Sequence, residues 1–529
     1  MSDKTALPFG WLELQLEGMF SKPGDDIVDG PFGSNLKASE YVPTGVPIAR
    51  LQNIDRNRFV SKNIQYVTKQ KAEQLARHTF TPGDILITKL GDPLGKACLA
   101  PSAIVKGVLV ADVVRARLTH HWIDRRFLCY QINADNVVEQ FKEQTKGTTR
   151  PRVNLTKIRT LDVRLCPLSE QTRIVEKLEE LLSDLDAGVA ELKAAQKKLG
   201  QYRQSLLKAA VEGALTAEWR AAQKVGAGET ALETGAQLLE RILTERRARW
   251  EAKQLTKFAE QGKVPPKDWQ KKYPEPVQPD TSDLPELPEG WVWASVEQLS
   301  EFVRNGLSKT PNTDGRGFPI FKINAVRPMT VSFAAIKHIE LCESEAADYW
   351  VEVGDVLATR YNGSVDLLGV FGMVKAVLQR TLHPDKLIRM KPMLGVRLGA
   401  WMEVCGNVGV SRAHLVARVK TTAGQTGISG EDLKKTPIPL PPFAEQEIAL
   451  TELEERLQAV KELEVPTEHS LKQSAAQRKN ILKAAFSGQL VPQDPNDEPA
   501  SVLLARIRAE RALRAAVKKP HGRKTKETA

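Results

Sequence analysis

The feature that most constrains the fold is an internal duplication. PLSEQTRIVEKLEELL (167–182) returns 275 positions later as PFAEQEIALTELEERL (442–457). Other pairs follow in the same order in both halves, with offsets between 265 and 280 positions. They are LPFGW (7–11) with LPEGW (287–291), GVPIARLQNI (45–54) with GFPIFKINAV (317–326), PGDILITKLG (82–91) with VGDVLATRYN (353–362), LLKAAVEGAL (206–215) with ILKAAFSGQL (481–490), and LLERILTERR (238–247) with LLARIRAERA (503–512). Such repetition predicts one structural unit that occurs twice.

Each copy has two parts of different composition. Residues 1–165 and 285–440 are rich in glycine, proline and short β-branched runs between turn signals, which predicts mixed, strand-rich domains. Residues 168–215 and 443–490 are strongly helix-forming, and the first of these segments contains no proline. We therefore expect each strand-rich domain to be followed by one long helix.

The spacing of apolar residues in these helices alternates between three and four, as in the seam of a coiled coil. A helix buried against its own domain is the other interpretation. In the second copy, Pro466 falls within the stripe and predicts a kink or break. The first stripe is Val175, Leu178, Leu182, Leu185, Val189, Leu192, Gln196, Leu199, Arg203 and Leu206; the second is Leu453, Leu457, Val460, Glu464, Thr467, Leu471, Ser474, Arg478 and Ile481.

The bulk properties narrow the class of protein. A chain of 529 residues is too long for one hydrophobic core, so we expect about two to four domains. The five cysteines are far apart and form no CxxC pair, which argues against a disulfide framework or a zinc cluster and favours a reducing cytoplasm. The sequence begins without a signal-peptide pattern and contains no apolar run of about 18 residues, so we expect neither export nor membrane spanning. The net charge of +11 fits either a polyanionic partner or a solvated basic surface.

Two further segments differ in composition from the strand-rich domains and the long helices. Residues 263–290 are polar and rich in proline, which predicts a semi-rigid linker. The run 503–526 carries nine basic residues against the single acid Glu510, which predicts a helix followed by a basic tail. Residues 221–262 and this tail are longer than the pattern requires, and we expect the additional helices to serve a partner interface.

Catalytic and metal-binding motifs are largely excluded. GDPLGKA (91–97) is too short for a phosphate-binding loop and lacks its Ser or Thr. LPPF (440–443) has leucine where an amino-methyltransferase needs a hydrogen-bonding residue. The eight histidines show no ligand spacing. Asp84 and Lys89 could form a carboxylate-lysine nuclease site, but the second copy has Arg360 in place of the lysine, and a turn before a buried strand is favoured.

Polar and basic residues gather in corresponding loops of the two copies. The loops 145–154 and 420–429, and the strand exits 88–92 and 359–363, keep their frame while their side chains change. Two domains that recognise different base sequences would need a constant frame with variable loop side chains. Ordinary solvated turns show the same pattern. Lysine and arginine suit phosphates or guanine edges, and threonine, asparagine and glutamine add short hydrogen bonds. The candidate DNA contacts are Lys89, Lys146, Thr148, Thr149, Arg150, Arg152, Asn154, Arg360, Asn362, Lys420, Thr421 and Gln425.

The order LPxGW, strand-rich domain, P-[LF]-x-EQ helix and [LI]LKAAxxGxL, present twice, resembles the specificity subunit of type I restriction-modification enzymes. The resemblance covers essentially the whole chain. It implies two target-recognition domains that read the halves of a split double-stranded DNA site, with no active site in this chain. It also implies two modification (methyltransferase) subunits that carry S-adenosylmethionine and methylate adenine, and restriction subunits, where present, that use ATP and Mg.

The resemblance further implies an α+β fold in which a long antiparallel helical (coiled-coil) pair separates the two target-recognition domains with pseudo-twofold symmetry. A helix of this length would span roughly 65 Å at about 1.5 Å per residue, comparable with two turns of duplex. The expected divisions are 1–166 and 285–441 for the recognition domains, 167–220 and 442–492 for the long helices, 221–284 for an accessory helix and linker, and 493–529 for a C-terminal helix and basic tail. The expected subunit-interface residues are Leu178, Leu182, Leu185, Leu192, Arg203, Leu453, Leu457 and Arg478.

Three questions stay open at this level. Arg203 and Arg478 occupy equivalent seam positions, where they either fix the register, meet a partner's carboxylate, or extend their charges out of the seam. A stand-alone DNA-binding nuclease is one alternative function. A coiled-coil assembly protein without a DNA function is the other.

Overall fold

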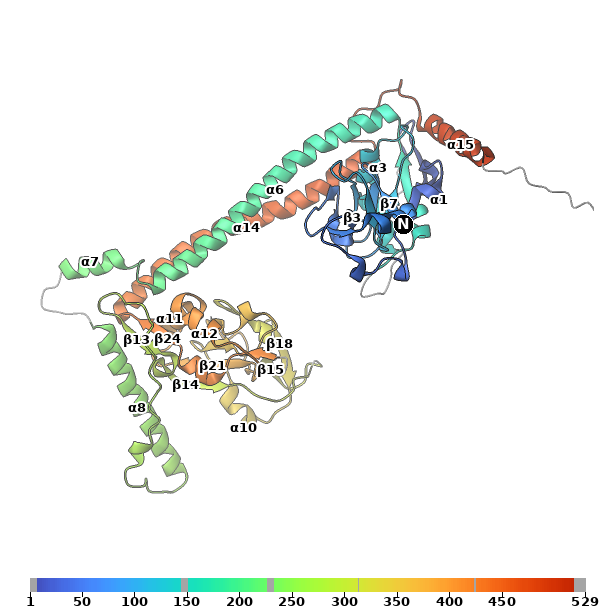
Figure 1. Cartoon of the computed structure of the whole chain (residues 1–529). Coiled ribbons are helices and arrows are strands. Elements are labelled where there is room, and N and C mark those ends of the chain that lie inside the picture. Colours follow the sequence, from blue (N-terminus) through green and yellow to red (C-terminus); the bar gives the residue numbers. More distant parts are fainter. Residues whose placement is uncertain (1–6, 144–150, 226–232, 313, 423–424, 518–529) are drawn as a thin grey trace, which may run out of the picture. The chain divides into compact units, whose positions relative to one another are not determined.

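The computed structural model describes residues 7–143, 151–225, 233–312, 314–422 and 425–517 (Figure 1). The chain forms two compact units, residues 1–194 with 468–529 and residues 195–467, and each is described by itself. We call residues 7–165 of the first unit the first globular domain, and residues 285–440 of the second unit the second globular domain. Among the described helices, none combines the length and apolar character needed to cross a membrane.

Each globular domain contains a four-stranded antiparallel sheet with the same strand order. The first domain orders them as β2 (Ile27–Asp29), β11 (Val113–Ala116), β8 (Ile85–Thr88) and β9 (Ala97–Leu99). The second domain orders them as β14 (Ser300–Asn305), β21 (Leu387–Pro392), β19 (Val356–Thr359) and β20 (Phe371–Met373). The central runs ILIT and VLAT are buried throughout, as continuous apolar strands covered on both faces should be.

The registers of the two sheets agree as well. Leu86 faces Arg115 in the first sheet, and Leu357 faces Arg389 in the second. A second antiparallel pair closes each domain beside the long helix: β1 (Leu12–Gln15) with β12 (Asp162–Leu165), and β13 (Val292–Ser295) with β24 (Pro437–Leu440). The predicted duplication is therefore confirmed as a repeated fold.

The remaining elements complete the two domains. In the first they are β3 (Val46–Ala49), β4 (Ile54–Asp55), β5 (Arg58–Phe59), β6 (Gln65–Val67), β7 (Thr79–Phe80), β10 (Gly107–Leu109), α1 (Pro23–Asp26), α2 (Lys69–Gln74), α3 (Arg125–Ile132), α4 (Asp135–Glu143) and α5 (Leu155–Arg159). In the second they are β15 (Phe318–Phe321), β16 (Val326–Arg327), β17 (Thr330–Val331), β18 (Ile336–Ile339), β22 (Lys420–Thr422), β23 (Gln425–Gly427), α9 (Val296–Leu299), α10 (Glu343–Ala346), α11 (Val396–Asn407), α12 (Gly409–Ala417) and α13 (Gly430–Lys434).

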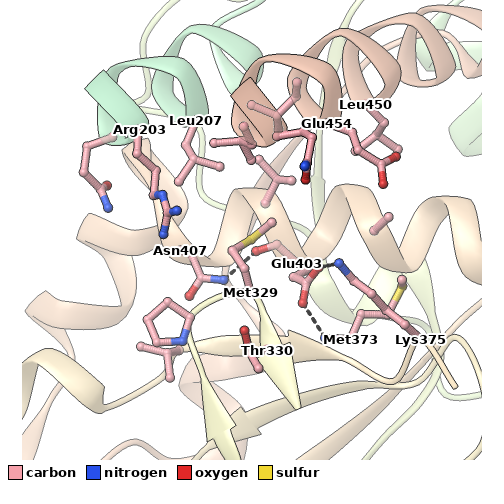
Figure 2. A pocket seen from close by; sticks show the side chains of 18 of the residues that line it. Arg203, Leu207, Met329, Thr330, Met373, Lys375, Glu403, Asn407, Leu450 and Glu454 are labelled. Carbon is pink, nitrogen blue, oxygen red and sulfur yellow. Dashed lines mark hydrogen bonds and ion pairs between the residues drawn. The ribbon is translucent and has the colours of Figure 1, made fainter. Parts of the chain in front are cut away.

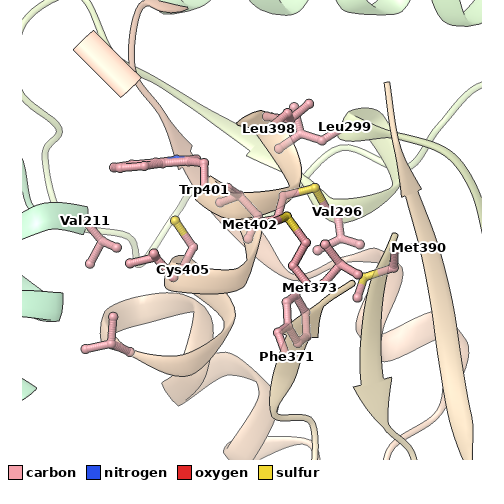
Figure 3. Close-up of a cluster of buried hydrophobic side chains, with 14 of the residues drawn as sticks. Val211, Val296, Leu299, Phe371, Met373, Met390, Leu398, Trp401, Met402 and Cys405 are labelled. Carbon is pink, nitrogen blue, oxygen red and sulfur yellow. The ribbon is translucent and has the colours of Figure 1, made fainter. Parts of the chain in front are cut away.

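The core of the second domain forms where α11 packs on its central sheet (Figure 3). Trp401 and Met402 of α11 are fully buried with Phe371 of β20. The Trp401 indole nitrogen donates to the carbonyl of Pro439 at 2.7 Å, so its one polar group is satisfied inside the core. This packing fixes the sheet whose strand exits carry the candidate contacts.

Two long helices, α6 (Leu168–Val211) and α14 (Phe443–Phe486), contain 44 residues each. In the first unit, Leu178 near the start of α6 is buried with Phe486 at the end of α14. In the second unit, Leu207 near the end of α6 is buried in one core with Leu453 near the start of α14. The predicted antiparallel pairing of the long helices is thereby confirmed.

The predicted break at Pro466 is wrong, because α14 is helical without interruption across this residue. Proline removes one backbone donor, which leaves the carbonyl of Glu462 without its usual partner. Both Pro466 and Glu462 are exposed, so water can replace the missing hydrogen bond. Six residues before Pro466, Val460 is buried in the core of the second unit and holds the helix in place.

The accessory helices pack on the globular domains. α15 (Ala500–Val517) places Leu503 and Ile507 in the core of the first domain, and its first N–H donates to the Gly10 carbonyl at 2.9 Å. α8 (Gly235–Glu260) packs in the corresponding way on the second domain, and its first N–H donates to the Gly290 carbonyl at 2.7 Å. Each domain is thus covered by the helix that follows the other copy's long helix. The short α7 (Ala217–Val225) precedes α8.

The expected linker begins with an ordered segment. Trp269 stacks on Trp250 of α8 with ring centroids 5.8 Å apart, and Tyr273 meets the same ring edge-on at 5.4 Å. Trp269 and Tyr273 are buried, so the chain from residue 263 folds back along α8 before it reaches the second domain.

Candidate DNA interface

In the first domain, the exit of β8 is joined to the segment that precedes α5. The Val153 N–H donates to the Lys89 carbonyl at 3.0 Å, and the Gly91 N–H donates to the Pro151 carbonyl at 3.3 Å. Leu90 and Arg152 face each other as a β-bridge. The backbone therefore brings the predicted residues Lys89, Arg152 and Asn154 to one edge of the domain.

The second domain repeats this connection at the exit of β19. The Ile428 N–H donates to the Arg360 carbonyl at 2.9 Å, and the Asn362 N–H donates to the Thr426 carbonyl at 3.4 Å. Tyr361 and Gly427 form the matching β-bridge. Arg360 and Asn362 thus lie beside the β22–β23 hairpin, which carries Lys420 and Thr421. The two predicted loops meet in both domains through the same backbone frame.

The side chains on the first frame differ in their exposure and in how firmly other residues hold them. Lys89 is only 2% exposed, and its ammonium lies 2.7 Å from Asp29 and 4.7 Å from the centre of the Phe32 ring. Arg152 is exposed and pairs with Asp112 at 2.6 Å. Asn154 is exposed, and its side-chain oxygen accepts from the Lys157 N–H at 2.9 Å, which caps α5. A DNA contact by Lys89 stays a prediction and would require its ammonium to leave Asp29.

On the second frame, Arg360 is half-buried over the ring of Tyr361, with 4.9 Å between guanidinium carbon and ring centre. The Asn362 side-chain oxygen accepts from the Ser364 N–H at 3.1 Å, which orders the turn after the strand. Lys420 and Thr421 are exposed, and the Thr421 hydroxyl lies 3.2 Å from that of Thr426. Their contact with DNA also stays a prediction.

Five candidates cannot be placed in this way. Lys146, Thr148, Thr149 and Arg150 lie outside the described residues. The backbone of Gln425 belongs to β23, but its side chain is not among the described ones.

The acidic residue before each central strand has a structural partner. The Asp84 carboxylate accepts from the Thr81 N–H and from Arg117, both at 2.7 Å. Asp355 accepts from the Glu352 N–H at 2.7 Å and from Arg389 at 2.6 Å. The favoured interpretation, a turn before a buried strand, is confirmed for both copies.

Because Asp84 and Lys89 each pair with a different residue, they do not form the shared carboxylate-lysine site that a nuclease would need. Burial raises the pKa of Asp355 in spite of the adjacent Arg389. Within the described parts of the chain, no three acidic, histidine or cysteine side chains cluster as metal ligands would.

The long helices meet through apolar residues and through charge. Leu178, Leu182 and Leu453 are buried, and Leu185 and Leu457 pack at the border of the same cores. Arg203 on α6 donates to Glu464 on α14 at 2.6 Å. Arg478 on α14 pairs with Asp186 on α6. Leu192 is half-buried. The role of these residues in binding another subunit stays a prediction.

A pair of tryptophan–glutamate hydrogen bonds was not foreseen from the sequence. The Trp11 indole donates to Glu170 at 2.9 Å, and the Trp291 indole donates to Glu445 at 2.8 Å. Glu170 lies in the first turn of α6, and burial raises its pKa. The signal was present, since GW and the EQ that begins each long helix are both duplicated.

Of the two carboxylates, Glu445 accepts more hydrogen bonds. Besides Trp291, it accepts from the Thr216 hydroxyl at 2.6 Å and from Arg220. These two residues follow the end of α6, and Glu445 lies in the first turn of α14. The contact therefore joins the end of one long helix to the start of the other inside the second unit.

A groove of about 1030 Å³ lies in the second unit between α11 and the facing sides of α6 and α14 (Figure 2). Glu403 on its wall is buried, accepts from the Met373 N–H at 2.7 Å and has the Lys375 ammonium 4.0 Å away. Burial raises the pKa of Glu403. Leu450 and Leu457 of α14 add an apolar side.

Comparisons with known proteins agree with this architecture. Residues 35–194 match the family model described as the type I restriction modification DNA specificity domain. The chain is 26% identical over 521 residues to the type I restriction enzyme EcoKI specificity subunit of Escherichia coli (strain K12), covering 96% of each chain. It is 22% identical over 519 residues to the StySPI specificity subunit of Salmonella potsdam, again covering 96% of each.

The fold is also shared with a solved structure. A chain from a structural study of complex assembly and conformational transition of the type I R-M system matches with a TM-score of 0.57 and 17% identity, covering 92% of this chain and 100% of that chain. The similarity thus extends over both copies of the duplicated fold as well as over the residues of the family model. Over nearly its whole length this chain is similar to the specificity subunits of type I restriction enzymes, and residues 35–194 match the type I restriction modification DNA specificity domain.

Proposed function

We propose that this chain reads a bipartite DNA target through its two globular domains and scaffolds the methyltransferase and restriction subunits of a type I restriction-modification complex. The observation that carries the proposal is the frame shared by the two domains, in which a strand exit is bonded to a polar segment. Arg152 occupies this frame in the first domain, and Arg360 with Asn362 in the second. Different side chains on one frame allow two different half-sites to be read.

The residues on each frame have separate roles in this proposal. Arg152 is exposed and oriented by Asp112, so its guanidinium can meet two acceptors of a guanine edge. Lys420 is exposed at the β22–β23 hairpin and contacts phosphate, which positions the domain without reading sequence. Lys89, held by Asp29, supports the frame from within the domain.

Chemistry in the complex belongs to other subunits. Two modification subunits supply S-adenosylmethionine and methylate adenine, and restriction subunits supply ATP- and Mg-dependent translocation and cleavage. This chain contributes specificity and assembly. The separate partners of Asp84 and Lys89 support this division over a stand-alone nuclease.

The antiparallel helices support a symmetric assembly with two modification subunits. Leu178, Leu182 and Leu453 are already buried inside the chain, so they hold the helix pair together. The modification subunits therefore use the outer faces of α6 and α14, where exposed residues such as Lys193 and Glu455 lie. Because the fold repeats, equivalent faces occur once on each copy.

The proposal is tested by mapping methylated adenines in cells that express the modification subunits with and without this chain. Methylation is expected at two short motifs separated by a constant spacer, and only when the chain is present. Methylation that is independent of the chain, or that follows a single continuous motif, would overturn the proposal. Incubation of the isolated full chain with duplex DNA and Mg²⁺ tests the nuclease alternative, and no cleavage is expected.

A further inference from the structure

We propose that residues 246–273, which we call the arm, hold the phosphate backbone of duplex DNA beside the half-site read by the second globular domain. The proposal rests on the DNA-reading function proposed above and adds a contact surface outside the reading frame. The arm consists of the distal part of α8 and the segment that folds back along it (Figure 1).

The arm is an ordered structure built on aromatic packing. Trp269 of the returning segment stacks on Trp250 of α8, and the Phe258 ring meets Trp269 edge-on with centroids 6.0 Å apart. Tyr273 completes the cluster, and Trp269 and Tyr273 are 8% and 9% exposed. The returning segment is therefore held along the helix, and its charges have a defined position.

Arg246 anchors the arm to the second domain. Its guanidinium is buried and donates to the Ser300 carbonyl at 3.0 Å and to the Tyr273 hydroxyl at 2.6 Å. One side chain thereby connects the helix, the returning segment and the start of β14. Motion of the arm relative to that sheet would break these hydrogen bonds, so the arm should act as a fixed part of the domain.

The arm carries several lysines that form no ion pair with the described residues. Arg247 and Arg249 have ion-pair partners on α8 or in the second domain, with Arg247 lying 3.2 Å from Glu251. By contrast, five exposed lysines have no carboxylate within 4.0 Å among the described residues. They are Lys253, Lys257, Lys263, Lys267 and Lys272. A group of uncompensated ammonium groups on an ordered surface is an electrostatic footprint for a polyanion.

Residues of α8 contact β14, and the positive charge of the arm follows this strand towards its end. Arg249 lies 3.5 Å from Glu301, one residue after the Arg246 contact at Ser300. Further along, Arg304 of β14 pairs with Asp348 at 2.8 Å and holds the pKa of that carboxyl below its usual range. Lys253 and Lys257 follow Arg249 on α8 at intervals of four residues, so they continue the same face of the helix beyond the contact with Glu301.

The end of β14 belongs to the edge that carries the candidate DNA contacts. Asn305 at this end faces Ile388 of β21, and the neighbouring Leu387 faces Thr359, the last residue of β19. The chain then continues into Arg360 and the reading frame. The basic part of the arm therefore lies on the side of the sheet where the DNA is proposed to bind.

The chemistry of the arm suits DNA better than a protein partner. Protein interfaces centre on buried aromatic anchors with a polar rim, but here Trp269 and Tyr273 are turned inward. Leu255 and Val264 are the exposed large apolar residues of the arm. Lysine, a mobile point charge, suits phosphates that differ little from one sequence to another. The arm should thus add affinity without adding sequence preference.

The test is the salt dependence of DNA binding by the full chain, alone and with its modification subunits. The quadruple variant K253Q/K257Q/K263Q/K267Q removes four charges, and K253R/K257R/K263R/K267R is the matched control that keeps them. The probe is a duplex of random sequence of about 60 base pairs, titrated between about 50 and 200 mM salt. The magnitude of the slope of log K against log salt should fall by about 3 to 4 in the glutamine variant, at about 0.9 for each of the four lost phosphate contacts.

The arginine control should keep the slope of the unmodified chain. Unchanged thermal midpoint and tryptophan fluorescence in the glutamine variant verify that the arm remains folded. Both variants should keep the unmodified ratio of affinities for target and random duplexes. A glutamine variant with an unchanged slope overturns the proposal, and so does one that loses affinity for the modification subunits while its slope is unchanged.

The outcomes separate this inference from the function on which it rests. If the unmodified chain shows no target preference, but the salt dependence of binding is weaker in the glutamine variant, the reading function is contradicted and the arm remains a phosphate contact. If the chain prefers its target and all variants have equal slopes, the reading function stands and the proposed phosphate contact of the arm is wrong.

Discussion

Arg203 of α6 donates to Glu464 of α14 across 2.6 Å, so two seam positions of the long helices meet inside the second unit. The equivalent arginine of the other copy, Arg478, meets Asp186 in the first unit. Each arginine therefore finds a carboxylate of the same chain, and the register of the pair is marked by charge in both units.

Charge reversal should test the register at the Arg203–Glu464 pair. The side chains are 42% and 24% exposed, so their coupling should be modest, about 0.5 to 1 kcal/mol. Arg203→Glu and Glu464→Arg should each lower the free energy of unfolding in urea, because like charges then face each other. The double reversal should recover most of the loss. A double variant whose loss equals the sum of the single losses would contradict the contact.

Removal of the Trp291 indole donor should destabilise the protein. Trp291→Phe leaves the buried Glu445 with one hydrogen bond fewer and should cost about 1 to 3 kcal/mol in urea unfolding. The matched control is Trp293→Phe, because this half-buried tryptophan donates to the Pro285 carbonyl at 3.2 Å through a solvent-exposed hydrogen bond. The control should cost less than about 0.5 kcal/mol. Equal losses in the two variants would show that the buried hydrogen bond is not responsible.

Glu403 should make stability depend on pH in the acidic range. Burial raises its pKa above the ordinary value of 4.5, so the folded state favours the protonated carboxyl. Its contribution is fully present below about pH 4.5 and is lost as pH rises through the raised pKa. Glu403→Gln keeps the oxygen that accepts from Met373 and should flatten this decline in the thermal midpoint. Glu454→Gln, at an exposed position of the same groove, should leave the pH profile unchanged.

Lys89 should prove important for folding. Lys89→Ala leaves Asp29 in a site where the lysine and aspartate side chains are 2% and 12% exposed, and should cost about 3 to 5 kcal/mol. Lys96→Ala, which breaks a half-exposed pair with Asp55 at 3.1 Å, should cost less than about 1 kcal/mol. Urea unfolding of both variants checks the difference. A stable Lys89→Ala protein that loses affinity for DNA would instead favour a direct contact by this lysine.

The duplication and the helix pair could be predicted because their signals are local and periodic. The stripe that contains Leu178 and Leu453 requires a helical partner, and the repeated order predicts that the partner belongs to the same chain. The predicted break at Pro466 was wrong because the cost of a helical proline depends on whether its turn is exposed, which the sequence does not state. The alternative of a kink at this residue stays a prediction.

The pairing of individual side chains could not be predicted in the same way. Lys89 looked like a free cation at a strand exit, because Asp29 lies 60 positions away in the chain. The packing of α15 on the first domain likewise depends on contacts between residues nearly 500 positions apart, such as Arg511 with Glu17. Backbone frames repeat between the copies and can be recognised, whereas partners distant in sequence are set by the fold.

The central claim is that each globular domain reads one half of the target. The most direct measurement is to map methylated adenines in cells that express the modification subunits with the Arg152→Ala chain, and separately with the R360A/N362A chain. The first variant should relax the base preference in one half-site and leave the other unchanged, and the second should do the reverse. Relaxation of both halves by either variant, or unchanged motifs in both, would contradict the account.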